Sequence, residues 1–387
     1  MNTHPFIPYG RQFISEEDIK SVVKILRSDF LTQGPKVNEF EEAFASYVHS
    51  KYAVAVSSGT AALHLSAIAL GIRPGTNVIT TPITFVSSAN CVRYCGGNIY
   101  FADIDPLTYT LDPMMVVELL SKYPKGTFSG IIPVDLAGYP VDMEILHDIA
   151  KKYKLWVLED ACHAPGGHFI DSRGNIQYCG NGENSDLTIF SFHPVKHITT
   201  GEGGMITTND FDLYRKLMIL RTHGVTKDQK FLLENHGGWY YEMQELGYNY
   251  RLTDIQAALG ISQLTTADEK LKRRTEIALH YDEAFKNSDI ITPKVDKGVQ
   301  HAYHLYIILV EDRLGLYNFL LKNGINSQVH YIPVYFHPYY QNLKQHKGDF
   351  PVAENYYKRC LSLPMYPSLT REQEGYVIKK VLEYVKK

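Results

Sequence analysis

Hydrophobic positions follow two kinds of spacing along the chain, and the first of them is helical. After Ser15, apolar residues recur on one helix face, at Ile19, Val22, Val23 and Leu26. Ser15 and Asp18 have the spacing of a capping box, which predicts that this helix begins there. The stretch LTQGPK at 31–36 interrupts the pattern, and a second helix is expected from Val37 to Val48.

Short apolar runs typical of buried strands then alternate with helical segments. The expected strands cover residues 52–56, 77–84, 99–103, 130–135 and 155–161, and the expected helices cover 61–70, 113–122 and 143–153. This alternation predicts an α/β fold with a mostly parallel central sheet flanked by helices. Ligands bind at the carboxyl ends of the strands in such sheets, where the stretches SSGT (57–60) and EDACH (159–163) both fall.

The pattern changes near residue 260. A charged helical segment covers 266–285, and one strand-like run, 304–310, follows it. We therefore expect a large domain at 1–260, which includes the N-terminal segment, and a smaller α+β domain at 261–387, joined by a long helix. A length of 387 residues agrees with two domains.

Composition narrows the class of protein. Hydrophobic residues make up 44% and charged residues 21%, a balance typical of globular proteins, and the net charge of -3 predicts no broad attraction to nucleic acid or anionic membranes. Five scattered cysteines without a C-x-x-C pair favour reduced thiols over disulfides or a zinc site. The first ten residues lack the charge and apolar core of a signal peptide, and no run of eighteen apolar residues occurs. We expect a soluble, cytoplasmic protein.

The stretch SFHPVKHITTGEGGM at 191–205 concentrates chemical groups. His193 and His197 have the spacing of two metal ligands on a helix, but Pro194 separates them and no third ligand is near, so we expect no metal. GEGG does not match G-x-G-x-x-G, and no strand is predicted before it, which disfavours a dinucleotide site. Lys196 remains, and a loop lysine by itself is usually a solvated charge.

Four further features give Lys196 a context. At Ser57–Thr60 small residues lie where a strand enters a helix, and free N–H groups there suit a phosphate, although an ordinary tight turn explains them equally well. Asp160 ends an apolar strand, so it needs a cationic partner, such as a protonated pyridine nitrogen, or exposure. Phe85 offers a ring to stack on a cofactor or to fill a core, and Asn249 precedes a long apolar helix, where a loop role is the alternative.

In this order, these motifs resemble the DegT/DnrJ/EryC1/StrS-type aminotransferases, fold-type I enzymes that use pyridoxal phosphate on nucleotide sugars. The resemblance runs from about Tyr9 to the C-terminus and includes the stretches SGT, TPITF, EDACHA, SFHPVKHITTGEGGM, RTHG and GYNYRLTDIQAALG. The segments LTQGP, LGISQL and NSQVHYIPVYFHPYY resemble members of the family that act in pseudaminic acid biosynthesis. The resemblance places the cofactor in the domain at 1–260.

Catalytic roles follow from the resemblance for three residues. It implies that Lys196 forms the Schiff base with pyridoxal 5'-phosphate and then moves a proton as acid and base, since only a primary amine can do both. It implies that Asp160 pairs with the pyridinium nitrogen and that His163 approaches the phenolic oxygen. The position of His163 is often glutamine in the family, and some relatives with histidine in place of the lysine are sugar dehydratases.

The resemblance also implies the remaining contacts to the cofactor. Phe85 stacks on its ring, Ser58, Gly59, Thr60 and Ser191 hold its phosphate, and Asn249 reaches the phosphate from a neighbouring subunit. The expected assembly is therefore a homodimer with shared active sites. The substrate contacts implied are Tyr9, Asp29, Phe30, Leu31, Thr32, Gln328, Val329, His330 and Tyr331, and Arg221 and Arg251 are candidates for the diphosphate, although both suit structural ion pairs equally well.

The reaction implied is transfer of the amine of L-glutamate, which leaves as 2-oxoglutarate, to C4 of a UDP-linked 2-acetamido-4-keto-2,6-dideoxy sugar. Its product is UDP-4-amino-4,6-dideoxy-N-acetyl-β-L-altrosamine. One alternative is another keto-sugar nucleotide: a UDP-4-keto-pentose, a GDP- or dTDP-4-keto-6-deoxyhexose, or a 3-keto sugar. A binding protein that has lost turnover is a second alternative, and a transcription regulator is disfavoured because neither end has a basic DNA-binding module.

Overall fold

The structure is a computed structural model that describes residues 6–343 and 345–386. A seven-stranded sheet lies at the centre of its larger part, in the order β1-β9-β8-β5-β4-β2-β3. Neighbouring strands are parallel except where β9 pairs with β1 and β8. The strands in this order are Tyr52–Val56, Gly204–Thr208, Leu187–Ser191, Trp156–Asp160, Gly130–Ile132, Asn77–Thr80 and Asn98–Phe101.

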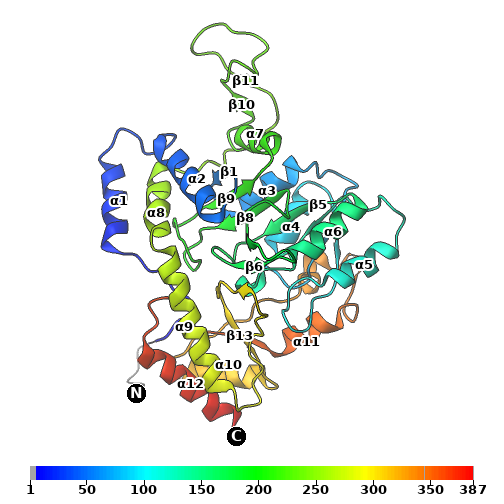
Figure 1. Cartoon of the computed structure of the whole chain (residues 1–387), viewed down its shortest axis with the longest axis vertical. Helices are drawn as coiled ribbons and strands as arrows, with labels where there is room; N and C mark the ends of the chain where they lie inside the picture. Colours follow the sequence, from blue (N-terminus) through cyan, green and yellow to red (C-terminus); the bar gives the residue numbers. More distant parts are fainter. Residues whose placement is uncertain (1–5, 344, 387) are drawn as a thin grey trace.

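Helices cover both faces of this sheet (Figure 1). They are α2 (Pro35–Val48), α3 (Gly59–Ala69), α4 (Ser87–Tyr94), α5 (Pro113–Ser121), α6 (Met143–Tyr153) and α7 (Phe211–Leu220). Helix α8 (Asp254–Leu264) packs on α2, and α1 (Glu16–Leu26) packs on α8 at the side of the molecule. The capping box predicted for α1 is confirmed, because Ser15 Oγ accepts from the Asp18 N–H at 3.2 Å and Asp18 accepts from the Ser15 N–H at 2.8 Å. The predicted mostly parallel α/β sheet is also confirmed.

The sequence prediction missed two central strands, β8 and β9, which lie on either side of the loop that holds Lys196. The loop leaves β8 at Ser191 and enters β9 at Gly204. Both strands carry threonines among their apolar residues, and Thr188, Thr207 and Thr208 are fully buried. A buried threonine in a sheet satisfies its hydroxyl locally, as Thr207 does by donating to the Gly180 carbonyl at 2.8 Å, so polarity in the sequence concealed a buried strand.

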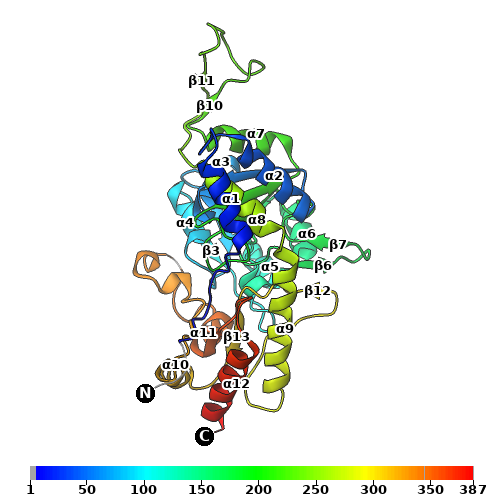
Figure 2. The ribbon, with the colours of Figure 1, turned by 90° about the vertical axis from the view of Figure 1, so that its left-hand side faces the viewer.

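The C-terminal part packs around a second core and a two-stranded sheet. Strands β13 (Tyr306–Leu309) and β14 (Cys360–Leu363) pair antiparallel, beside helices α9 (Ala267–Phe285), α10 (Arg313–Lys322), α11 (Pro351–Arg359) and α12 (Arg371–Val385). Figure 2 shows α9 continuing downward from α8 along one side of the molecule. The helix is interrupted at Thr265 and Thr266, between α8 and α9. The domain boundary near residue 260 stays a prediction.

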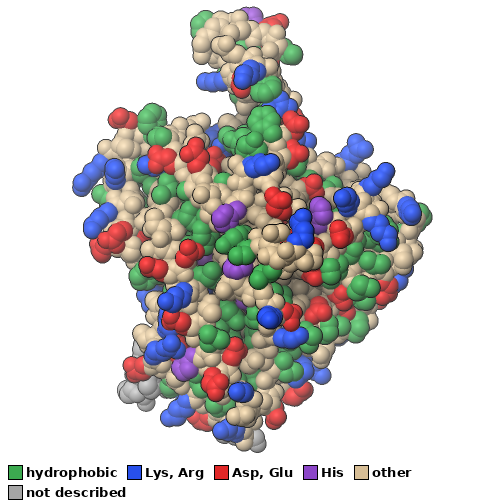
Figure 3. Space-filling view, in the orientation of Figure 1, with side chains coloured by type: hydrophobic (Ala, Val, Ile, Leu, Met, Phe, Trp, Pro, Cys, Tyr) green, Lys and Arg blue, Asp and Glu red, His purple; other side chains and the backbone are tan. Residues whose placement is uncertain are grey.

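A hairpin stands clear of the rest of the molecule (Figures 1 and 3). It is built on β10 (Val225–Thr226) and β11 (Glu242–Met243), which pair antiparallel. The hairpin and the turn after it expose several large apolar side chains, Leu233, Trp239, Tyr241, Met243 and Leu246. A short antiparallel strand, β12 (Val299–Gln300), extends a separate small sheet with β6 (His168–Ile170) and β7 (Ile176–Tyr178).

Over the described ranges, none of the helices combines the length and the apolar character that a membrane crossing requires.

Candidate active site

A cavity of about 420 Å³ opens at the carboxyl ends of the parallel strands. The ends of β1, β5 and β8 meet there because parallel strands share one carboxyl edge, and β9 begins at the same edge. Eleven of the predicted site residues line it: Tyr9, Ser58, Gly59, Thr60, Phe85, Asp160, His163, Ser191, Lys196, His330 and Tyr331. The sheet thus assembles residues that are far apart in the sequence.

Lys196 extends into this cavity from the loop between β8 and β9. Its backbone N–H donates to the His193 carbonyl at 2.9 Å, which holds the loop in a tight turn around Pro194. Its Nζ lies 3.5 Å from His304 Nε2. Burial lowers the pKa of the lysine, because desolvation disfavours the ammonium, and Arg274 adds to the effect while Cys162 and Asp160 oppose it. Lys196 is therefore biased toward the neutral amine that nucleophilic attack requires.

Asp160, the last residue of β5, is 5% exposed and faces the same cavity. Its carboxylate accepts from Ser88 Oγ at 2.7 Å and from the Cys162 N–H at 3.2 Å. In the part of the chain that the structure describes, no lysine or arginine forms an ion pair with it. A buried carboxylate held by neutral donors suits a cationic group supplied by a ligand, such as a protonated ring nitrogen.

The N-terminus of α3 forms one end of the cavity. Ser58 caps this helix by accepting from the Ala61 N–H at 3.0 Å, and its first residue is Gly59. A Cβ at Gly59 would lie 2.9 Å from the Ser191 Cβ, so the backbone approaches β8 more closely than a side chain allows. The free N–H groups and the helix dipole favour an anion here, as the sequence predicted.

Two aromatic groups border the space between Lys196 and Asp160. Phe85 is 57% exposed, so its ring is not part of the core, and its centroid lies 6.1 Å from that of Tyr331. His163 Nδ1 accepts from the Ala137 N–H at 3.2 Å, which leaves the ring proton on Nε2, 3.2 Å from the Tyr331 hydroxyl. Burial lowers the pKa of His163 well below its ordinary value, with Lys196 contributing, so the ring is neutral.

The structure does not bring the other predicted residues into this cavity. Asn249 is exposed in the loop before α8, and the segment 29–32 lies beside the start of α8, where Leu31 accepts from the Asp254 N–H at 3.0 Å. Gln328 pairs with Ser362 of β14 through both backbone hydrogen bonds, and Val329 follows it. Arg221 forms an ion pair with Glu41 and donates to the Ala55 carbonyl at 2.7 Å. It therefore has the structural role that was the alternative to binding the diphosphate.

Some residues of the cavity were not predicted from the sequence. His304 lines the cavity and contacts Lys196, 108 residues away along the chain. Ser88 lies behind the lining and contacts Asp160, 72 residues away. His197 does not act with His193, since its Nε2 donates to the Ala302 carbonyl at 2.7 Å. Other unpredicted lining residues are Leu63, Thr84, Ser87, Val134, Cys162, His193, Val195 and Glu202.

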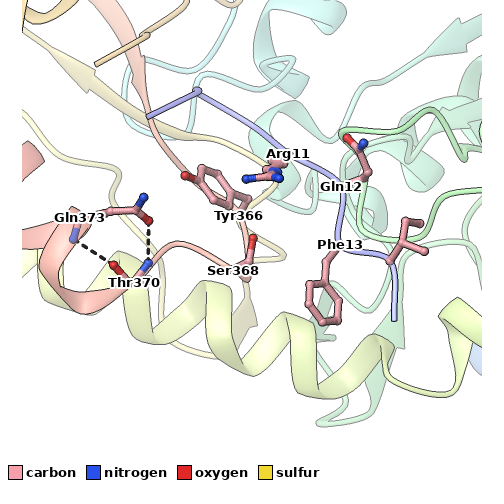
Figure 4. A pocket seen from close by; sticks show the side chains of 8 residues that line it. Arg11, Gln12, Phe13, Tyr366, Ser368, Thr370 and Gln373 are labelled. Atoms are coloured by element: carbon pink, nitrogen blue, oxygen red, sulfur yellow. Dashed lines mark hydrogen bonds between the residues drawn. The ribbon is translucent and has the colours of Figure 1, made fainter. Parts of the chain in front are cut away.

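A second hollow, of about 440 Å³, lies between the N-terminal segment and the start of α12 (Figure 4). Two of its polar residues, Thr370 and Gln373, are used to cap α12, and among the described residues neither a lysine nor a buried carboxylate lines it. Thr370 accepts from the Gln373 N–H at 3.2 Å, and Gln373 accepts from the Thr370 N–H at 3.0 Å, which completes a capping box. The cavity around Lys196 is therefore the candidate active site.

The sequence profile of the DegT/DnrJ/EryC1/StrS aminotransferase family matches residues 12–382. The chain belongs to this family. It is 41% identical to the spore coat polysaccharide biosynthesis protein SpsC of Bacillus subtilis, over 98% of this chain and 97% of that one. It is 37% identical to the UDP-4-amino-4,6-dideoxy-N-acetyl-beta-L-altrosamine transaminase of Campylobacter jejuni, over 98% and 99%. A putative sugar aminotransferase, Spr1654 of Streptococcus pneumoniae in its PMP form, superposes with a TM-score of 0.90 at 31% identity, over 98% and 99%.

Family and fold together establish the class of enzyme. The chain is a sugar aminotransferase that depends on pyridoxal phosphate, and its fold is that of fold-type I. The residues present fit the cofactor: a buried amine, a buried carboxylate without a cationic partner, and an anion-binding helix N-terminus line one cavity. The predictions of fold class, enzyme class and cofactor are confirmed.

Proposed function

We propose that this enzyme transfers the amino group of L-glutamate to C4 of a UDP-linked 2-acetamido-4-keto-2,6-dideoxy sugar, giving UDP-4-amino-4,6-dideoxy-N-acetyl-β-L-altrosamine and 2-oxoglutarate. The observation that carries the aminotransferase part is that Lys196 and Asp160 line one cavity. The choice of sugar is supported by a relative that bears this name at 37% identity over nearly the full length. The proposed reaction is a step of pseudaminic acid biosynthesis.

The roles proposed for the chain's own groups follow from their surroundings. Bound pyridoxal phosphate supplies an aldehyde carbon and an electron-accepting ring. Lys196 binds that carbon and, when released, carries a proton to and from the substrate carbon, for which its lowered pKa suits it. Asp160 holds the ring nitrogen protonated, oriented by Ser88 and the Cys162 N–H.

The phosphate and ring contacts complete the proposed cofactor site. Ser58, Gly59, Thr60 and Ser191 surround the anion-binding end of the cavity, and Phe85 covers the ring. His163 donates through Nε2 toward the phenolic oxygen, a role that its neutral state and its bond from Ala137 permit.

Three of the proposed substrate residues line the cavity. Tyr9 and His330 have ring centroids 5.5 Å apart, and Tyr331 lies beside them. Aromatic and polar groups of this kind suit an acetamido sugar and a uracil ring. The segment Asp29–Thr32, Gln328 and Val329 remain proposed contacts that lie outside the cavity of their own chain.

We propose a homodimer in which each active site takes residues from both subunits. Asn249 and the segment 29–32 do not line the cavity of their own chain, and in a dimer they would be free to contact the cavity of the partner copy. The hairpin exposes Leu233 at 92% and Trp239 at 75%, apolar area that a monomer would leave in water.

The test is a substrate panel. Purified enzyme is incubated with glutamate and with UDP-2-acetamido-4-keto-2,6-dideoxy sugars of both C5 configurations, UDP-4-keto-pentose, and GDP- and dTDP-4-keto-6-deoxyhexoses. Products are identified by mass and NMR. Selective amination of a UDP-acetamido sugar to the altrosamine product supports the proposal, and a preference for any other sugar contradicts it.

A further inference from the structure

His304 lies directly beside the reacting amine. Its Nε2 is 3.5 Å from Lys196 Nζ and is the hydrogen-bond partner of that nitrogen over the residues that the structure describes. The residue comes from the segment that leads into β13, and it is 5% exposed. The sequence predicted no role for His304, yet the structure places its imidazole beside the amine of Lys196.

A buried arginine holds the segment that bears His304. Arg274 of α9 is 1% exposed and donates through one guanidinium nitrogen to the carbonyls of Tyr303 at 3.0 Å, His304 at 3.3 Å and Met365 at 3.1 Å. The imidazole also packs against the His163 ring, with centroids 4.3 Å apart. These contacts give the ring little freedom to turn away from Lys196.

The hydrogen-bond pattern indicates where the proton of His304 lies. Its Nδ1 is buried and has no partner in the described part of the structure, whereas its Nε2 faces Lys196. A buried N–H without an acceptor is costlier and rarer than a lone pair without a donor. The neutral tautomer with hydrogen on Nε2 is therefore favoured. Burial first, and Lys196 next, lower the pKa of His304 well below its ordinary value, which excludes the imidazolium near neutral pH.

We propose that His304 maintains Lys196 as a neutral amine by donating its Nε2 hydrogen to the lone pair of Nζ. A donor that faces the nitrogen stabilises the amine and repels the ammonium. At 3.5 Å the bond is long, so the amine can give it up when it attacks. This inference rests on the proposed role of Lys196, and it adds the residue that sets the protonation state of that lysine.

Other charged and titratable groups also face Lys196, and some raise its pKa while others lower it. Asp160 and Cys162 favour the ammonium, whereas burial and Arg274 favour the amine. The remaining groups nearby are imidazoles with lowered pKa values, His163, His197 and His330. With Asp160 in the same cavity, the neutral lysine needs a specific stabilising contact, and His304 provides it.

Neutron diffraction of the deuterated holoenzyme in its pyridoxamine form, in which Lys196 is free, tests the tautomer directly. At neutral pH we expect deuterium on His304 Nε2, none on Nδ1, and two deuterons on Lys196 Nζ. Deuterium on Nδ1 alone, or three deuterons on Nζ, would overturn the proposal. Borohydride trapping on the aldehyde form tests the role of Lys196 separately, since an adduct on another residue refutes that role whatever the tautomer of His304.

Variants provide a second readout, the pH dependence of the half-reaction of the pyridoxamine form with 2-oxoglutarate, in which Lys196 begins as a free amine, followed by cofactor absorbance. His304→Leu removes the donor and should move the midpoint up by about one pH unit, while His304→Gln keeps an N–H there and should stay close to the wild-type midpoint. His301→Asn is the control, because the buried His301 accepts from the Tyr303 N–H at 2.8 Å and asparagine retains that acceptor. Equal midpoints in the leucine and glutamine variants would refute the proposal.

Discussion

Ser88 donates its hydroxyl hydrogen to Asp160 at 2.7 Å, from the second residue of α4 to the last residue of β5. Ser88 Oγ is itself 2.8 Å from Thr84 Oγ1, so two hydroxyl groups brace one carboxylate oxygen. The second carboxylate oxygen accepts from the Cys162 N–H. Asp160 is thus presented to the cavity in one orientation before any ligand binds.

Removing this hydroxyl should weaken cofactor binding. A hydrogen bond to a charged group contributes about 1.5–3 kcal/mol, so Ser88→Ala should raise the dissociation constant for pyridoxal phosphate about 10- to 100-fold. Equilibrium titration of the cofactor-free enzyme measures it. Ser66→Ala is a matched control, since Ser66 is equally buried and its hydroxyl has no partner in the described structure. An unchanged constant for Ser88→Ala would show that Asp160 does not need this brace.

Replacing the reacting amine should abolish covalent attachment of the cofactor. Lys196→Ala should yield no borohydride-trapped adduct by peptide mass spectrometry, and turnover should fall by at least about 10²- to 10⁴-fold, the range for loss of a general acid–base group. Lys196→Arg introduces a permanent positive charge and provides no amine that can react, and it should behave in the same way. Wild-type turnover in either variant would refute the assignment.

The close approach at the start of α3 predicts a steric effect on the anion-binding end of the cavity. Gly59→Ala places a Cβ 2.9 Å from the Ser191 Cβ, and relieving such crowding costs about 1–3 kcal/mol. We expect a loss of about tenfold or more in cofactor affinity, measured by the same titration. Gly375→Ala in α12 meets open space and should leave that affinity unchanged while slightly stabilising the helix.

A buried pair of carboxyl groups behind the active site predicts how stability depends on pH. Burial first, and Glu159 next, raise the pKa of Asp135 well above its ordinary value, and burial also raises the pKa of Glu159. The folded state therefore holds more protons than the unfolded state, and stability falls as pH rises from the ordinary carboxyl pKa through the raised ones. Asp135 Oδ1 accepts from the Val141 N–H at 2.9 Å, and carboxylate oxygens of Asp135 and Glu159 lie within 4.8 Å of each other.

Asp135→Asn tests this account. The amide retains the acceptor for Val141, supplies a permanent donor toward Glu159, and removes one titrating group. Each pKa unit by which burial raises a carboxyl group costs about 1.4 kcal/mol above the raised pKa. We expect the variant to melt higher than the wild type at pH 8, with the difference shrinking toward pH 4.5 in thermal melts across that range. If the melting temperatures of the wild type and the variant changed in parallel with pH, the proposed effect of these two carboxyl groups on stability would be refuted.

Because the hairpin exposes large apolar side chains, we expect the proposed homodimer to depend on them. Leu233→Ser with Trp239→Ser should shift the enzyme toward the monomer, as measured by light scattering after size-exclusion chromatography. Activity should fall with the dimer because Asn249 lies outside the cavity of its own chain. Leu314→Ser is the control, since Leu314 is 65% exposed on α10 at the opposite end of the molecule. A double variant that remains dimeric would refute the role of the hairpin.

The sequence by itself determined the alternation of strands and helices and the start of α1, and through its resemblance to a family it indicated the residues proposed to carry the chemistry. These features are local. A short window of sequence is enough to recognise helical spacing, a four-residue capping box or a loop that contains one lysine. The resemblance rests on such short motifs, and the structure places Lys196, Asp160 and the residues Ser58, Gly59 and Thr60 around one cavity. Strands β8 and β9 were missed because their buried threonines look polar in sequence.

Only the tertiary structure decided which distant groups touch. Ser88 meets Asp160, and His304 meets Lys196, because the sheet order and the buried Arg274 bring α4 and the segment before β13 to the same edge. No periodicity encodes such pairs, since their separation along the chain is unrelated to their separation in space. The packing of the strands and helices, rather than any motif, determines which groups surround Lys196 and Asp160.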